Sequence, residues 1–212
     1  MNSPFIFTVH LPSNLEKGKK YPVIYAMHGM GSDEVDIHNL IEELQNDFIL
    51  IAIRGTLAKD NGFAYFKIKS FGNPDIDSFD SAVANLKEFI VNAPKDYPID
   101  TESQYLLGFS QGAILSMTLA LTMGDKLKGI IALSGYIPRH VKASYPIESV
   151  EKLSVFISHG EFDPIFPVSI GQDNYDFFKA RNGKVTYKHY PAGHEVSFDM
   201  KVDFIKWLNS TL

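Results

Sequence analysis

Short strand-like runs, several of them wholly apolar, alternate along this chain with longer helix-like segments. The run Phe48–Ile53 is apolar at every position, as expected for a strand that is buried on both faces of a sheet. The segment from Ala113 to Met123 is rich in Ala, Leu and Met, which favour helix. Strands are predicted near residues 4–11, 22–28, 48–54, 104–109, 129–134, 154–158 and 184–190, and helices near 34–46, 77–93, 111–124, 168–182 and 196–210.

This alternation predicts an α/β fold with a mostly parallel central sheet and helices on both faces. Because 212 residues suffice for one substantial core, we expect residues 1–212 to form a single domain without a separate lid domain. Asp77 or Ser78 is expected to cap the second predicted helix, and Gly124 to close the third. The stretch 55–76 has no clear periodicity, and long loops of this kind are often functional.

Composition and charge exclude several classes of protein. The net charge of −5 gives no reason to expect binding to nucleic acid or to an anionic membrane. The chain has no cysteine, so disulfides, thiol nucleophiles and cysteine-ligated metals are excluded. Its histidines are dispersed, so no metal site is expected. The first ten residues have no basic segment followed by an apolar core, and no run is long enough for a membrane span. The cytoplasm is therefore the expected location.

A serine lies between two glycines in the sequence Gly108-Phe109-Ser110-Gln111-Gly112. A strand-like run precedes this motif and a helix-like run follows it. Strand, sharp turn and helix form the context in which G-x-S-x-G indicates a nucleophile elbow. Ser110 is therefore the candidate nucleophile, provided that the rest of the chain supplies a base and a group that orients the base.

Two later loops supply candidates for those roles. Asp163 follows the predicted strand that ends at Ser158, and His194 follows the strand that ends at Tyr190. In open α/β sheets, ligands bind at the carboxyl ends of the strands. The chain order Ser110, Asp163, His194 is that of α/β-hydrolases. The prediction is a triad in which His194 is the base and Asp163 orients it. Alternative orienting groups, all within predicted helices, are Asp173, Asp176 and Asp199.

Attack on a carbonyl also needs hydrogen-bond donors for the developing oxyanion. The backbone N–H of Gln111, at the start of a helix, is one candidate. The second is the N–H of Met30, in the glycine-rich loop His28-Gly29-Met30-Gly31 that follows an early strand. His28 is expected to shape this loop, and His159 to brace the loop that carries the acid.

With these motifs the chain resembles the phospholipase/carboxylesterase family of α/β-hydrolases, which includes bacterial carboxylesterases and acyl-protein thioesterases. The resemblance rests on the glycine-rich loop, the string Gly108–Ala113, His159-Gly160 with Asp163, Pro167-Val168, and Gly193-His194. It implies the same triad and the same two oxyanion amides, and no cofactor. Related enzymes are often dimers, so a homodimer is compatible with the resemblance. The chain departs from the family pattern at Ser32, Phe166 and Lys67, which affects the preferred acyl and leaving groups.

Aromatic and aliphatic residues of the long loop and of the loops near the triad are expected to wall an apolar acyl pocket. These residues are Phe63, Tyr65, Phe66, Phe71, Tyr136, Ile165 and Phe166. The predicted function is hydrolysis of small to medium acyl esters or thioesters through an acyl-enzyme on Ser110. The partner is thus a small-molecule acyl substrate. Two alternatives remain open: a non-hydrolytic ligand-binding member of the fold, and a perhydrolase-like enzyme that transfers the acyl group to peroxide.

Overall fold

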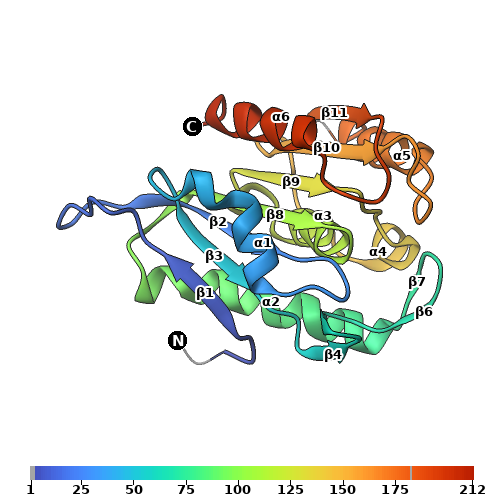
Figure 1. Cartoon of the computed structure of the whole chain (residues 1–212), viewed down its shortest axis with the longest axis horizontal. Coiled ribbons are helices and arrows are strands. Elements are labelled where there is room, and N and C mark those ends of the chain that lie inside the picture. The colour runs from blue at the N-terminus through green and yellow to red at the C-terminus, as the bar shows by residue number, and fades with distance from the viewer. Residues whose placement is uncertain (1–2, 182) are drawn as a thin grey trace.

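The computed structural model describes residues 3–181 and 183–212, and its centre is a seven-stranded sheet (Figure 1). The strands are β1 (Phe7–His10), β2 (Tyr21–Met27), β3 (Ile49–Ile53), β8 (Ile99–Phe109), β9 (Gly129–Leu133), β10 (Ser154–Gly160) and β11 (Lys184–Tyr190). Their order across the sheet is β1-β3-β2-β8-β9-β10-β11. Only the pairing of β1 with β3 is antiparallel among these neighbours. The carboxyl ends of six strands therefore lie at one edge of the sheet.

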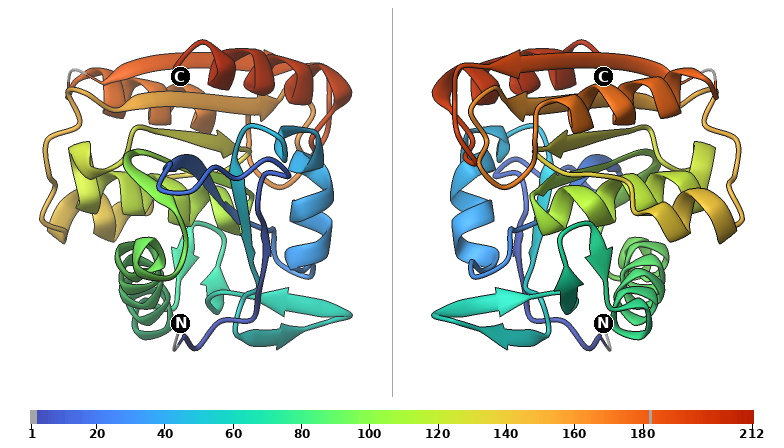
Figure 2. Two further views of the ribbon diagram at one scale, coloured as in Figure 1. Left: turned by 90° about the vertical axis from the view of Figure 1, so that its left-hand side faces the viewer. Right: turned by 90° about the vertical axis from the view of Figure 1, so that its right-hand side faces the viewer.

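Helices cover both faces of the sheet. On one face lie α1 (Glu34–Ile41) and α6 (Phe198–Asn209). On the other lie α2 (Ile76–Asp96), α3 (Gln111–Met123), α5 (Ser169–Lys179) and the short α4 (Arg139–Ser144). Figure 2 shows α1 and the group of α2, α3 and α4 on opposite sides of the sheet. Two 3₁₀ turns, η1 (Glu42–Leu44) and η2 (Gly124–Lys126), follow α1 and α3. The predicted arrangement, a mostly parallel central sheet with helices on both faces, is confirmed.

The burial pattern explains why the central elements form where they do. All five residues of β3 and all five of β9 are buried, as expected of strands covered on both faces. Every residue of α3 is buried as well, because α3 packs against the middle of the sheet. In α2 the buried positions recur three or four residues apart, from Phe79 to Ala93, so one stripe of this helix faces the core.

Helix ends follow local capping chemistry. The helix predicted from residue 77 begins at Ile76, and its N-cap is Asp75, whose side chain accepts a hydrogen bond from the N–H of Ser78. The expectation of Asp77 or Ser78 as the cap is therefore wrong, since Asp75, earlier in the chain, already accepts a hydrogen bond from a free backbone N–H of the first turn. Gly124 closes α3 at φ +57°, as predicted. The helix predicted over 168–182 ends at Lys179, and residue 182 lies outside the described residues.

The stretch 55–76 forms two small hairpins rather than an open loop. They are β4 (Leu57–Lys59) with β5 (Gly62–Ala64), and β6 (Ile68–Ser70) with β7 (Asn73–Pro74). Figure 2 shows β4 and β5 projecting beyond the main sheet. Strands of two or three residues are too short to show periodicity, so the sequence pattern did not predict them. The short helix α4 was missed for the same reason.

Candidate active site

The nucleophile elbow lies where β8 ends and α3 begins. Ser110 has φ +52°, a left-handed conformation that a non-glycine residue rarely adopts. The flanking glycines are required by close backbone contacts. A Cβ on Gly108 would lie 2.1 Å from the carbonyl oxygen of Gly112, and a Cβ on Gly112 would lie 2.0 Å from that of Met27. The motif therefore lets strand and helix approach closely enough to hold the serine in its strained position.

His194 and Asp163 come from two other strand ends and meet at this serine. The Nε2 atom of His194 lies 2.9 Å from Ser110 Oγ, and its Nδ1 atom lies 2.7 Å from Asp163 Oδ2. These distances are within hydrogen-bond range. The hydrogen bond to Asp163 favours the tautomer in which Nδ1 carries the proton and Nε2 is free to accept one from the serine. The arrangement can move a proton away from Ser110 Oγ.

The second oxygen of Asp163 is held by the chain that follows it. Its Oδ1 accepts hydrogen bonds from the amides of Ile165 and Phe166, both at 2.8 Å. Burial acts to raise the pKa of the Asp163 carboxyl, but the hydrogen bonds from His194 and the two amides outweigh it, so this pKa is lowered. The buried His159 donates from Nε2 to the carbonyl of Phe166 at 2.9 Å and thereby braces the same loop.

The alternative aspartates lie away from the base. Asp173 and Asp176 are on α5, and Asp199 is in the first turn of α6. Asp176 accepts a hydrogen bond from Gln172 on its own helix. The carboxylate within hydrogen-bond distance of His194 is that of Asp163.

Two backbone amides lie at the same cavity as Ser110. Among the described residues, the N–H groups of Met30 and Gln111 donate to no protein acceptor, so both can donate to a substrate oxygen. The side chain of Gln111 is occupied elsewhere. Its Oε1 accepts from the N–H of Tyr65 at 3.0 Å, and its Nε2 donates to the carbonyl of Phe66 at 2.8 Å. The start of α3 is thus tied to the chain between the two hairpins.

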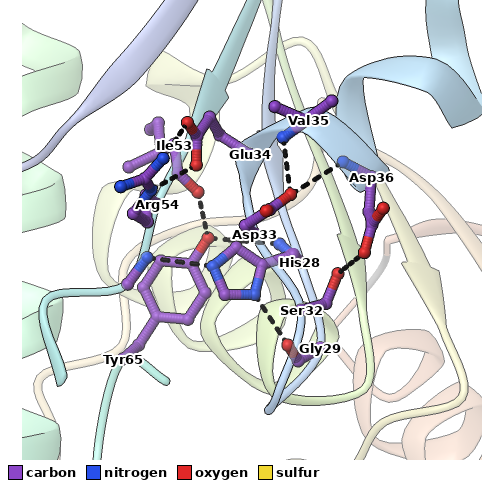
Figure 3. A network of polar contacts seen from close by, with 11 residues as sticks. His28, Gly29, Ser32, Asp33, Glu34, Val35, Asp36, Ile53, Arg54 and Tyr65 are labelled. Atoms are coloured by element: carbon purple, nitrogen blue, oxygen red, sulfur yellow. Dashed lines mark hydrogen bonds and ion pairs between the residues drawn. The ribbon is translucent and has the colours of Figure 1, made fainter. Parts of the chain in front are cut away.

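The buried ring of His28, which is 1% exposed, holds the glycine-rich loop in place through hydrogen bonds (Figure 3). Its Nδ1 lies 2.6 Å from the carbonyl of Gly29, and its Nε2 accepts the N–H of Gly55 at 3.0 Å. A ring that donates from Nδ1 and accepts at Nε2 is neutral, and burial lowers the pKa of His28 accordingly. The N–H of His28 donates to the hydroxyl of Tyr65, which in turn donates to the carbonyl of Ile53.

The β4–β5 hairpin braces the other side of this loop. The N–H of Gly31 donates to the carbonyl of Phe63, and the N–H of Phe63 donates to that of Ser32, both at 2.8 Å. The guanidinium of Arg54 lies 4.5 Å from the centre of the Phe63 ring and pairs with the buried carboxylate of Glu34. The hydrogen bond from Arg54 is the main cause that lowers the pKa of Glu34. Figure 3 shows this pair beside the glycine-rich loop.

A mostly apolar cavity of about 370 Å³ opens at Ser110. Four of the seven predicted pocket residues, Phe71, Tyr136, Ile165 and Phe166, contribute to its wall. The cavity is lined by Met30, Ile68, Phe71, Gly72, Ser110, Gln111, Ile114, Tyr136, Ile165, Phe166 and His194.

Three predicted pocket residues lie elsewhere. Tyr65 is 2% exposed and its ring lies against that of His28, with ring centres 4.8 Å apart and the planes tilted by 37°, because its hydroxyl joins two strand ends. Phe63 faces Arg54, because its backbone pairs with the glycine-rich loop. Phe66 packs edge-on against Phe79 of α2 with ring centres 4.9 Å apart, and it borders a neighbouring cavity instead. The expectation that these three wall the cavity at the serine is therefore wrong.

The structure adds residues that sequence patterns did not single out. Ile68, Gly72 and Ile114 also line the cavity. Asn174 of α5 is 1% exposed and anchors the loop that carries Tyr136. Its Oδ1 accepts from the N–H of Ile137 and its Nδ2 donates to the carbonyl of Gly135. The sequence offered one indication of this role: Asn174 is a polar residue at a position of a predicted helix that would otherwise be apolar and buried.

Comparisons with known proteins place the chain among hydrolases. A family model described as phospholipase/carboxylesterase matches residues 14–212. The chain therefore belongs to the phospholipase/carboxylesterase family, and it is a hydrolase with the α/β-hydrolase fold. This confirms the family to which the sequence motifs pointed.

Individual relatives agree with this assignment. The chain is 31% identical over 157 residues to acyl-protein thioesterase 1 of Debaryomyces hansenii, covering 70% of this chain and 67% of the relative. It is 25% identical over 182 residues to the putative hydrolase MhqD of Bacillus subtilis, covering 86% and 90%. In structure it is similar to the Bacillus cereus carboxylesterase, with a TM-score of 0.88, 22% identity, and coverage of 100% and 96%.

Among the residues that the structure describes, no group of three or more His, Asp or Glu side chains is arranged to hold a metal ion. No helix within residues 3–181 and 183–212 is both long and apolar enough to cross a membrane.

Proposed function

We propose that the protein hydrolyses small to medium carboxylic esters or thioesters through a Ser110–His194–Asp163 triad. The observation that supports this most directly is the continuous hydrogen-bonded chain from Asp163 through His194 to Ser110 Oγ, at 2.7 and 2.9 Å. A serine, a base within reach and a group that orients the base are the requirements for nucleophilic catalysis. The family assignment gives the reaction class, and this geometry supports the role that we propose for each side chain.

The proposed reaction has two steps. Ser110 Oγ attacks the carbonyl carbon while His194 Nε2 takes the hydroxyl proton, and the carbonyl π electrons move onto oxygen. Collapse of the tetrahedral intermediate breaks the bond to the leaving group, which takes the proton from His194 and departs as an alcohol or thiol. Water then attacks the acyl-enzyme with His194 again as base, releasing the carboxylic acid and restoring Ser110. Asp163 stabilises the imidazolium in both steps.

The oxyanion is proposed to be bound by the amides of Met30 and Gln111. Both amides lack a protein acceptor within the described residues and both residues line the cavity at the serine. Their positions are set by Tyr65, His28 and the Gln111 side chain, so they need little rearrangement during the reaction. Preorganised donors of this kind make the largest single contribution to the rate enhancement of many enzymes. One such donor contributes a factor of about 10²–10³ in rate.

The wall of the cavity supports an apolar acyl group. Phe71, Tyr136, Ile165 and Phe166 provide that wall, and the volume of about 370 Å³ suits a short or medium chain. The names of the relatives, acyl-protein thioesterase and carboxylesterase, include both thioester and ester substrates. We propose no cofactor, since the steps above need none. We also propose that the whole chain is one domain, since a single sheet takes strands from Phe7 to Tyr190.

Labelling with a fluorophosphonate probe followed by peptide mapping tests this proposal. We expect one adduct, on Ser110, because only an activated serine attacks the phosphorus. Ser110→Ala should lose both labelling and turnover of soluble esters with a nearly unchanged thermal melt. Ser81→Ala, on the exposed surface of α2, is the matched control and should label fully. A folded protein without an adduct would contradict the triad and favour the ligand-binding alternative.

A further inference from the structure

The cavity at Ser110 adjoins a second, larger cavity. The second cavity has a volume of about 720 Å³ and shares Met30 and Ile68 with the first. Neither Ser110 nor His194 lines it. It is bounded by the two hairpins of the stretch 55–76. A substrate held at the serine that is long enough to pass Met30 and Ile68 would reach this second cavity.

The second cavity combines an apolar wall with two cationic side chains. Leu57, Ala64 and Phe66 are apolar lining residues, and the exposed residues Lys59 and Lys67 line the same cavity. Lys67 forms no ion pair with any described residue, and Lys59 pairs only with the exposed carboxylate of Asp60, at 3.3 Å. An exposed pair of this kind is weak. In a chain with a net charge of −5, these two lysines form a local positive site.

A third lysine, close to Lys67 in the sequence, is arranged differently. Lys69 of β6 pairs with Asp75 at 3.2 Å, and it does not line the cavity. The pair joins Lys69 to the N-cap of α2. Lys67, just before β6, forms no such pair with any residue that the structure describes. The chain at β6 thus offers one lysine available to a ligand and one matched lysine that is already paired.

The position of the base indicates which end of a substrate reaches these lysines. The leaving group receives its proton from His194, so it must lie within hydrogen-bond reach of that side chain. The second cavity adjoins Met30, whose amide is the proposed oxyanion donor, and not His194. The part of the substrate that extends into it is therefore the acyl group. An acyl chain would cross the apolar wall and place its far end near Lys59 and Lys67.

We propose that the preferred substrates are esters or thioesters whose acyl group ends in a carboxylate, that is, monoesters of medium-length dicarboxylic acids. This inference rests on the proposed function and adds the chemical class of the acyl group. The apolar walls accept the methylene chain, and the ammonium groups of Lys67 and Lys59 bind the terminal carboxylate. Such charge-assisted contacts favour an anionic acyl end over a methyl end of equal length.

The test compares matched substrates on the full-length protein. The 4-nitrophenyl monoesters of adipic and suberic acid differ from 4-nitrophenyl hexanoate and octanoate only in the terminal carboxylate. We expect a higher kcat/KM for each carboxylated ester, mainly through a lower KM. The preference should weaken at about 1 M salt, where the screening length is about 3 Å. A preference that is absent in the wild-type enzyme would overturn the proposal.

Variants that change the charge of single lysines identify which side chains cause the preference for a carboxylated acyl group. Lys67→Met keeps the aliphatic stem and should lower kcat/KM for the carboxylated esters about 3- to 10-fold, with hexanoate and octanoate nearly unchanged. Lys67→Arg should retain the preference, and Lys67→Glu should reverse it. Lys69→Met is the matched control and should leave the preference intact. A loss of preference in Lys69→Met equal to that in Lys67→Met would contradict the assignment, because it would indicate a general charge effect.

The outcomes separate this proposal from the proposed function. If the neutral esters are hydrolysed in a Ser110-dependent manner without any preference for a carboxylate, the acyl-end proposal fails and the triad stands. If neither kind of ester is hydrolysed and the fluorophosphonate probe gives no adduct, both fail together.

Discussion

Asp163 uses its two carboxylate oxygens for different partners: Oδ2 faces His194, whereas Oδ1 accepts the amides of Ile165 and Phe166. Asp163→Asn keeps an oxygen for the two amides but places an NH₂ group opposite His194 Nδ1. The imidazole then adopts the other tautomer, with a proton on Nε2, and cannot accept the serine proton. We expect kcat to fall about 10⁴-fold with little change in thermal stability.

The control for this substitution is Asp173→Asn, on the exposed surface of α5. Steady-state kinetics with a soluble ester should give near wild-type values for it. If Asp173→Asn were impaired as strongly as Asp163→Asn, the assignment of the orienting carboxylate would be wrong.

His28 makes stability depend on pH through a single buried ring. Burial lowers its pKa below the ordinary value of 6.5, so the folded state favours the neutral ring. The stabilisation is complete above pH 6.5 and is lost as the pH falls towards the lowered pKa, because the unfolded chain binds the proton first. His28→Asn removes this titration. The difference in free energy of unfolding between wild type and variant should therefore shrink on acidification, by at most about 1.4 kcal/mol per pH unit.

Urea denaturation at a series of pH values measures that difference directly. Taking the difference between the two proteins cancels the contribution of the other histidines. Two pH profiles that run parallel would show that His28 does not titrate between the folded and unfolded states.

At the scale of elements, the elbow depends on how closely β2, β8 and α3 approach one another. Gly112→Ala would place a methyl group 2.0 Å from the carbonyl oxygen of Met27. The backbone must then move, and we expect a loss of about 3 kcal/mol in the free energy of unfolding. Gly193→Ala is the control, because no atom lies within 4 Å of the added methyl group. Its stability should change by less than about 0.5 kcal/mol. Equal losses in chemical denaturation would contradict this explanation.

The two hairpins of residues 57–74 show what sequence patterns miss at this scale. Their aromatic residues suggested a substrate wall, and Phe71 does line the cavity. Phe63 and Tyr65 instead support the glycine-rich loop, through backbone pairing and a buried hydroxyl. An aromatic side chain looks the same in a sequence whether it faces a ligand or a neighbouring element. Its position depends on hydrogen bonds to residues about thirty or more positions away, such as Phe63 to Gly31 and His28 to Tyr65.

For the whole molecule, we expect the way the cavity at Ser110 opens to solvent to determine whether dissolved or emulsified esters are preferred. The segment between β3 and α2 consists of two short hairpins, and the cavity at Ser110 is about 370 Å³. We expect soluble short- and medium-chain esters to be hydrolysed faster than emulsified long-chain triglycerides, without a rise in rate when an oil–water interface is added. Titration of released acid at equal ester concentrations measures this. Faster cleavage of the emulsion would contradict the proposed substrate size.

The sequence by itself determined the succession along the chain of the main-sheet strands and the longer helices, the family, and the positions of Ser110, Asp163 and His194 in the chain. These features depend on local information: runs of apolar residues, helix formers, and a glycine spacing that only a sharp strand-to-helix turn requires. The parallel arrangement then follows, and it places the ends of β8, β10 and β11 at one edge of the sheet. Residues that follow separate strands were thus expected to meet, and the structure places them within hydrogen-bond distance of one another.

Only the tertiary structure decided which side chains surround the sheet edge that carries Ser110, Asp163 and His194, and which contacts hold the loops there in place. Hydrogen bonds join distant segments of the chain in three places. They link His28 to Tyr65 and Gly55, the Gln111 side chain to the backbone at residues 65–66, and Asn174 to the loop at Ile137. The tertiary structure also decided the arrangement at the second cavity: Lys67, just before β6, lines it and has no ion pair among the described residues, whereas Lys69, within β6, is paired with Asp75 and does not line it. The physical reason is that burial and hydrogen bonding are properties of packed neighbours, and a linear pattern specifies those neighbours only when the contacts are local.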